Sequence, residues 1–431
     1  FCRAMKRRAP LAFALLLCFC LRTDGALNGT VAIVTTIGGA PKNQLFTFLC
    51  YHLAAGFDHV FVFFDNPKSP DLAVAKAFGP EEVTPIVNGP ELFENWKASR
   101  LFNKFAGFRD EEVMARQILN ADWAVHESKR MGFQWLLHLD VDEAFYGEGV
   151  DVQQHFLELS ARGYSQGVYL VNEGVPQKPW MSLSQGGEAF MRTTLFKRNV
   201  VNIHTPAAQQ AKNEFAQTRG GAWHQGYFVG KSAGRMTHDI FPLEVTRWFV
   251  NHKGTTQAVF DVPSIRHFIN LSPAAIVDKY KQIGDFSDTT WDPKRVDPAF
   301  LPHKDKFPPS SKGLQYHNYM RDVAKRGPKA VKAEVERQSL LSDYQLTKML
   351  DTGAFFRDET LSAFIKEQCP IAQWKKNKFT GHRPRAAGTC SSDGECGLEP
   401  PTDIDATLSH GESTHKHIHT HHTHTHTHTH T

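Results

Sequence analysis

Two aspartates separated by one residue follow an apolar run. Residues 135–139 have the character of a strand, and Asp140, Asp142 and Glu143 come directly after it. In an extended backbone alternate side chains share a face, so Asp140 and Asp142 are expected to point together at one cation. Carboxylate oxygens suit hard divalent cations, and such a pair could hold a metal-bound diphosphate. The spacing alone is weak evidence for such a site, because a second Asp-x-Asp lies in the polar C-terminal tail with no strand before it.

Strand-like and helix-like segments alternate from Thr30 onward and would position these acids. Strands are predicted at residues 31–37, 59–64, 83–87, 135–139 and 167–171, and helices at residues 41–55, 71–78, 110–131 and 152–161. This alternation predicts an α/β fold, with a mainly parallel sheet and helices on both of its faces. Ligands of such open sheets bind outside the carboxyl ends of the strands. Thr36, Asp65 and Asp140 all sit at or beside such ends.

Length and composition allow one large globular domain or two smaller ones. The chain has 431 residues, 41% of them hydrophobic, and a formal net charge of +4 without a long basic run, so nothing indicates a nucleic-acid partner. We expect a main domain at residues 30–307, a helical C-terminal extension at 308–385 and a disordered tail at 386–431. The tail ends in a His-Thr repeat, for which metal binding and an origin in a CA dinucleotide repeat are both open.

The N-terminal segment has the layout of a secretory signal. Lys6, Arg7 and Arg8 precede an apolar run at residues 9–21, which is short beside the roughly 20 residues that a bilayer span needs. We therefore expect residues 1–26 to be a signal peptide, or a short signal anchor that makes the chain a single-pass type II membrane protein. Either interpretation predicts that the body of the protein is secreted or lies in the ER or Golgi lumen.

Sequons and cysteines are compatible with that compartment. Asn28 and Asn270 begin acceptor sequons for N-glycosylation. An even number of cysteines lies beyond the N-terminal segment, which suits an oxidising environment, and Cys390 with Cys396 could close a small loop. For Cys50, a free buried thiol and a disulfide are equal alternatives.

Several stretches of the chain resemble the GT-A glycosyltransferases of the family 2 and family 92 type. These are residues 57–66 (FDHVFVFFDN), the helix that carries Gln117 and Asn120, residues 135–143 (WLLHLDVDE), residues 227–235 and residues 266–280. The resemblance covers roughly residues 31–285. It departs from the family at Ala144, which is inserted before Phe145, where the family usually has the aromatic residue directly after the acids.

The resemblance implies a GT-A (Rossmann-like) domain that transfers a sugar from a nucleotide-sugar donor to a glycan or glycoprotein acceptor. It also implies that Mn²⁺ or Mg²⁺ bridges the donor diphosphate, because a divalent ion stabilises the charge on the departing nucleoside diphosphate. The implied ligands are Asp142, which contacts the metal directly, Asp140, which contacts the metal or the ribose, and His267. Glu143 would support them. A solvated turn is the alternative for the two aspartates, and a histidine satisfied within the core is the alternative for His267.

Other residues are candidate contacts of the donor. Thr36 ends the first strand, and Asp65 matches the strand-end acid that commonly meets the nucleoside in GT-A folds. An Asx turn leading into Pro67 is the alternative for Asp65. Gln117 and Asn120 lie three residues apart on one helix flank, where their amides could bind the donor or face solvent.

Charged residues further along the chain complete the candidate site. Lys231 and Arg235 could neutralise the donor diphosphate, or they could lie on the surface. An inverting transferase also needs a carboxylate base that deprotonates the acceptor hydroxyl. Glu173 and Asp239 are both candidates for this base.

Two other functional classes compete with sugar transfer. A phosphohydrolase of the haloacid dehalogenase type also uses Asp-x-Asp after a strand, but Ala144 stands where that class has Thr or Val, and the motif lies far from the start of the chain. The other class is a non-catalytic carbohydrate- or metal-binding protein on a transferase scaffold. The inserted alanine keeps that interpretation open.

Overall fold

A computed structural model describes residues 29–40, 43–110, 112–175, 186–218, 230–250, 256–268, 273–282 and 312–370. Several predicted features lie outside these ranges: the N-terminal signal segment, both sequons, the Cys390–Cys396 loop, the domain boundary near residue 307 and the tail. Among the described residues, none of the helices combines the length and the hydropathy that crossing a bilayer requires.

Strands and helices alternate through the first half of the chain, and their order is less regular in the second half. The strands are β1 (Val31–Ile37), β2 (His59–Phe64), β3 (Val83–Val87), β4 (Trp135–His138), β5 (Glu143–Tyr146), β6 (Gln166–Gly174), β7 (Leu195–Lys197), β8 (Lys231–Arg235), β9 (Ile240–Glu244), β10 (Arg247–Val250), β11 (Gln257–His267) and β12 (Phe355–Arg357). The helices are α2 (Gln44–Ala54), α3 (Leu72–Lys76), α4 (Pro90–Trp96), α5 (Phe102–Phe105), η1 (Ala106–Phe108), α6 (Val113–Met131), α7 (Val152–Ala161), α8 (Gly186–Arg192), η3 (Val200–Asn202), α9 (Pro206–Thr218), α10 (Pro273–Gln282), α11 (Lys312–Lys325), α12 (Pro328–Ser339), α13 (Asp343–Asp351) and α14 (Thr360–Gln368).

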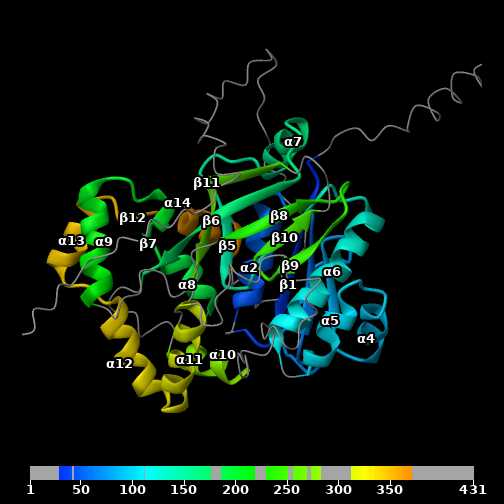
Figure 1. The fold of residues 1–431 in the computed structure, drawn as a ribbon, viewed down its shortest axis with the longest axis horizontal. Helices are drawn as coiled ribbons and strands as arrows, with labels where there is room; N and C mark the ends of the chain where they lie inside the picture. Colours follow the sequence, from blue (N-terminus) through cyan, green and yellow to red (C-terminus); the bar gives the residue numbers. More distant parts are fainter. Residues whose placement is uncertain are drawn as a thin grey trace, which may run out of the picture. The chain divides into compact units, whose positions relative to one another are not determined.

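One sheet organises the described part of the chain (Figure 1). Its strand order is β12-β7-β6-β8-β4-β1-β2-β3, with β11 beside β6 and β5 beside β11. Strands β3, β2, β1 and β4 run parallel, and β8 lies antiparallel between β4 and β6. Since β8 is antiparallel to both neighbours, β6 runs in the direction of β4. The predicted α/β class with a mainly parallel sheet is confirmed.

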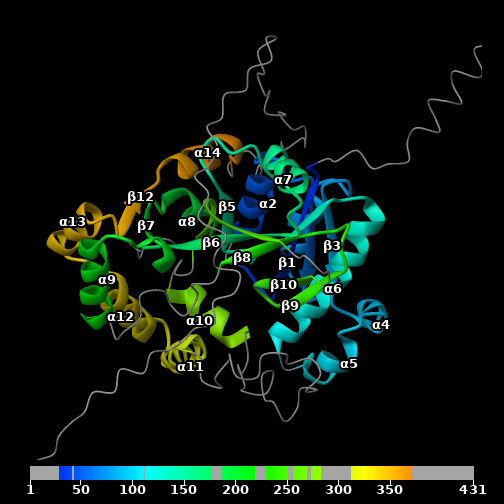
Figure 2. The same cartoon turned by 45° about the horizontal axis from the view of Figure 1, so that its top comes forward.

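Helices cover both faces of the sheet, as the alternation predicted. Helices α2 and α7 pack on a core that takes Val31 and Ile33 from β1, whereas α4, α5 and α6 pack on a core that takes Ala32 and Val34. Both views show α4, α5 and α6 together on one side of the strands (Figure 1, Figure 2). Because side chains alternate along a strand, β1 supplies both cores, and all of its residues are buried.

The region after Asn172 is more regular than the sequence indicated. Its described residues contain β7 to β11, and most of these strands pair antiparallel or are interrupted by bulges. Short strands with glycine and polar residues carry a weak periodic signal, so their pairing was not predictable. The expected helical extension contains α11 to α14, and it also contributes β12, which pairs with β7 at the edge of the sheet.

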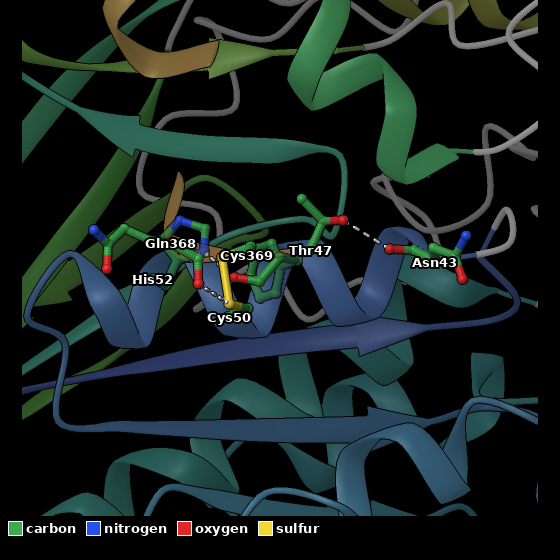
Figure 3. Close-up of a disulfide and its surroundings, with 7 residues drawn as sticks. Asn43, Thr47, Cys50, His52, Gln368 and Cys369 are labelled. Atoms are coloured by element: carbon green, nitrogen blue, oxygen red, sulfur yellow. Dashed lines mark hydrogen bonds between the residues drawn. A yellow bond between two sulfur atoms is a disulfide. The ribbon is translucent and has the colours of Figure 1, made fainter. Parts of the chain in front are cut away.

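A disulfide joins the start of the fold to the end of its described part. Cys50 on α2 bonds to Cys369, which follows α14, across 319 residues of sequence and a Cα–Cα distance of 5.8 Å (Figure 3). Both residues are buried. Of the two alternatives left open for Cys50, the structure has the disulfide, because a partner distant in sequence packs against α2.

His52, two residues after Cys50, connects α2 to the strand that follows the acidic motif. Its Nδ1 lies 2.8 Å from Phe48 O, and its Nε2 accepts the Phe145 N–H at 3.3 Å. Nδ1 must then carry the proton and donate to Phe48. Burial lowers the pKa of His52 to about 3, so the ring is neutral in this fold.

Candidate functional site

The acidic motif forms a tight turn between β4 and β5. The backbone N–H of Glu143 donates to Asp140 O at 3.0 Å, and the Glu143 carboxylate accepts the Asp140 N–H at 2.8 Å. The expectation of an extended backbone that aims Asp140 and Asp142 the same way is wrong, because β4 ends at His138 and the chain reverses. The two aspartates therefore have different neighbours on either side of the turn.

Surrounding elements hold this turn in place. Gln44, at the start of α2, donates through Nε2 to Val141 O at 3.1 Å, and the Phe268 N–H after β11 donates to Asp142 O at 2.8 Å. The Tyr51 hydroxyl donates to Phe145 O at 2.7 Å. Helix α2 and the end of β11 thus fix the backbone of the turn.

Asp140 faces α6 and β8. Gln117 Nε2 donates to Asp140 Oδ1 at 3.1 Å, and Lys231 Nζ donates to Asp140 Oδ2 at 2.7 Å. Lys231 is fully buried and also lies 3.5 Å from Glu143 Oε2. Burial acts to raise the pKa of Asp140, but the Lys231 ammonium outweighs it and holds that pKa below its usual range. Burial raises the pKa of Glu143 to about 7 despite the same lysine.

Asp142 faces β11 and α10. Lys279 Nζ donates to Asp142 Oδ2 at 2.9 Å, and His267 Nε2 lies 3.7 Å from the same oxygen. Burial acts to raise the pKa of Asp142, but Lys279 and His267 outweigh it, so the net shift is downward. For His267 burial acts to lower the pKa, and the Asp142 carboxylate more than offsets this, so the net shift is upward.

Helix α6 lines the neighbouring strand ends with polar side chains. Asn120 Nδ2 donates to Thr36 Oγ1 at 3.0 Å, and the Trp96 indole N–H donates to Asn120 Oδ1 at 3.2 Å. Arg116 Nη2 donates to Asp65 Oδ2 at 2.8 Å, with both side chains mostly buried. Together with the bond from Gln117 to Asp140, these contacts join the ends of β1, β2 and β4 to one helix. The sequence predicted that these strand ends meet at one edge, but not that α6 contacts all three.

The predicted metal ligands are not gathered into one group. The part of the chain that the structure describes has no cluster of three or more His, Cys, Asp or Glu side chains arranged to hold a metal ion. Asp142 and His267 are neighbours, but Asp140 turns toward Lys231, and a lysine ammonium lies within 3 Å of each aspartate. As arranged, this donor set does not fit a divalent ion. The involvement of Mn²⁺ or Mg²⁺ stays a prediction.

A buried row of charged residues extends from the turn across the sheet. In the register of the sheet, Glu143 on β5 lies opposite His267 on β11. His267 in turn lies opposite Glu173 on β6, and Glu173 lies opposite Lys197 on β7. The Glu173 carboxylate is fully buried and lies 2.7 Å from Lys197 Nζ. Glu173 therefore belongs to the same region as the acidic turn, through His267.

Two predicted site residues lie elsewhere. Arg235 pairs with Trp135 at the amino end of β4, about 13 Å along β8 from Lys231. Asp239 follows β8 at that same end and forms an exposed ion pair with Arg100, with an N–O distance of 2.5 Å. The structure does not bring Arg235 or Asp239 to the edge that carries Asp140.

Three charged residues of this region were assigned no role from the sequence. Arg116 lies one helical turn before Asn120, so the helical spacing that drew attention to Asn120 could have included it. Lys197 and Lys279 have no such signal, because each meets its acid through pairing or packing distant in sequence.

Two curated plant proteins are similar to part of the chain. The chain is 27% identical over 271 residues to one Arabidopsis thaliana protein named glycosyltransferase-like, covering 60% of this chain and 54% of that protein. It is 23% identical over 248 residues to a second protein of that name from the same plant, covering 54% and 46%. The chain is thus similar to glycosyltransferase-like proteins. It spans about half the length of these curated relatives.

Other comparisons add little. No protein-family model matches the chain. A solved structure of CMP:2-keto-3-deoxy-manno-octonic acid synthetase complexed with CTP shares 14% identity and covers 38% of this chain and 58% of its own, with a TM-score of 0.18. A likeness this slight carries no argument about this protein.

Proposed function

We propose that the protein transfers a sugar from a nucleotide-sugar donor to a glycan or glycoprotein acceptor. The observation that carries the proposal is the polar edge formed where β1, β2 and β4 end, with Thr36, Asp65 and Asp140 all contacted from α6. Such an edge is where open α/β sheets bind their ligands. The similarity to glycosyltransferase-like proteins supports the same function, and the family 2 or family 92 assignment is part of this proposal.

The donor would lie along this edge with its two ends in different surroundings. The nucleoside would meet Asp65 and Arg116, whose paired carboxylate and guanidinium can exchange hydrogen bonds with a base or ribose. The diphosphate would meet the acidic turn, where Lys231 and Lys279 supply positive charge.

The acceptor must lose a proton as its oxygen attacks the sugar. Glu173 is the better candidate for the base, because it neighbours His267 across β11 and β6, whereas Asp239 follows β8 at the amino end of β4. Glu173 would have to part from Lys197 in order to accept that proton.

The compartment is also a proposal. A disulfide between Cys50 and Cys369 suits the oxidising lumen of the secretory pathway, because reducing systems in the cytosol keep such thiols reduced. The predicted N-terminal signal or anchor agrees with an ER or Golgi location.

The test is a transfer assay with the full chain and a panel of nucleotide sugars, with and without Mn²⁺. Release of a nucleoside diphosphate that depends on a sugar acceptor, and that Asp142→Asn reduces strongly, is expected. Absence of both transfer and donor hydrolysis across the panel, or full activity in Asp142→Asn, would overturn the proposal. Release of phosphate from simple monoesters would instead favour a phosphohydrolase.

A further inference from the structure

The ion pair between Asp142 and Lys279 suggests a role for a lysine that the sequence left unassigned. Lys279 lies on α10, 137 residues after Asp142, and its Nζ donates to Asp142 Oδ2 at 2.9 Å. The Asp142 side chain is 11% exposed, whereas the Lys279 side chain is 37% exposed. Lys279 therefore neutralises a nearly buried carboxylate while its own side chain stays partly exposed.

Lys279 has the capacity to bind a ligand at the same time. An ammonium carries three N–H donors, and among the described residues Lys279 makes one hydrogen bond, which is to Asp142. Lys231, by contrast, is fully buried between Asp140 and Glu143. Of the two lysines that meet the acidic turn, Lys279 is the one whose side chain is partly exposed.

A divalent ion and Lys279 would compete for the same oxygen. An ion bound to Asp142 Oδ2 would lie beside an ammonium that already contacts this atom, and two cations at such a separation repel each other. Asp140 is likewise compensated by its own lysine. Each aspartate of the turn is therefore already paired with an ammonium, and Lys279 occupies the position beside Asp142 that a divalent ion would take.

We propose that Lys279 is the residue that binds the diphosphate of the donor, in the place where the family resemblance expects Mn²⁺ or Mg²⁺. The inference rests on the proposed function and names the group that holds its leaving diphosphate. One ammonium would bridge the Asp142 carboxylate and a phosphate oxygen through charge-assisted hydrogen bonds. Asp142 then orients the lysine, and the nucleotide binds without a metal ion.

The test is calorimetric binding of UDP, GDP, ADP and dTDP to the full chain, in EDTA and in Mn²⁺. At least one nucleotide should bind in EDTA, and Mn²⁺ should change its affinity little. Lys279→Met should weaken binding in EDTA by about 10- to 100-fold, the range of a charge-assisted hydrogen bond. Lys279→Arg should retain much of the affinity, and Lys348→Met, which removes a lysine paired with Glu214 on α9, is the matched control.

The outcomes separate this inference from the proposed function. Binding only in Mn²⁺, with equal affinity in wild type and Lys279→Met, would overturn the role of Lys279 and leave sugar transfer standing. Failure of every nucleotide to bind in either condition would overturn both. If Lys279→Met does not fold, as judged by circular dichroism, Lys279→Gln and Lys279→Arg provide the comparison, and equal affinities for these two would contradict the inference.

Discussion

Lys231→Met is expected to lower the free energy of unfolding by about 3 kcal/mol. The Lys231 ammonium is fully buried, 2.7 Å from Asp140 Oδ2 and 3.5 Å from Glu143 Oε2. Removing one partner of a buried ion pair costs about 3–5 kcal/mol, because it leaves a charge uncompensated. The lower end applies here, because the Asp140 side chain is 34% exposed and can be rehydrated, and Glu143, with its pKa raised to about 7, can take up a proton.

Urea denaturation followed by circular dichroism measures this loss. The loss should be smaller at about pH 5 than at about pH 8, because protonation neutralises Glu143 in the variant, and adding Asp140→Asn should recover part of it. Lys325→Met is the control, because its pair with Asp322 is exposed on both sides and contributes little. A loss for Lys231→Met no larger than the roughly 1 kcal/mol of a surface pair would refute the reasoning.

Three further predictions concern stability and catalysis. Burial lowers the pKa of His52 to about 3, so the unfolded chain binds a proton at this histidine more readily than the folded chain does. The free energy of unfolding should therefore fall by roughly 5 kcal/mol as the pH is lowered from about 6.5 to about 3. His52→Gln should flatten this dependence in urea denaturation, and an unchanged slope would contradict it. Glu173→Gln should abolish nucleoside diphosphate release while Asp239→Asn reduces it far less; the reverse ranking would move the base to the other end of the sheet. Reduction of the Cys50–Cys369 disulfide should lower the free energy of unfolding by about 2–5 kcal/mol, and an unchanged urea midpoint would show that it adds no stability.

The first half of the fold was predictable because its signals are local. The runs that predicted β1, β2 and β3 are apolar and rich in β-branched and aromatic residues, and the structure gives these strands the same bounds. Parallel strands place their carboxyl ends at one edge. For that reason the sequence alone predicts that Thr36, Asp65 and Asp140 lie at the same edge of the sheet.

The rest of the site depends on contacts between distant parts of the chain. The insertion of β8 between β4 and β6 decides that Lys231 reaches Asp140 while Arg235 does not, and no local pattern encodes that register. At Asp140 a turn was only the alternative interpretation, because an Asp-x-Asp is equally compatible with the end of a strand. Lys279 reaches Asp142 from a helix beyond β11, which only the folded chain reveals.

A crystal structure of the full chain with a bound nucleoside diphosphate tests the central claim most directly. The account predicts that the nucleoside lies against Asp65 and Arg116, with the diphosphate over the turn at Asp140 and within hydrogen-bonding distance of Lys279. A nucleotide bound at the opposite end of the strands, beside Arg235, would contradict it.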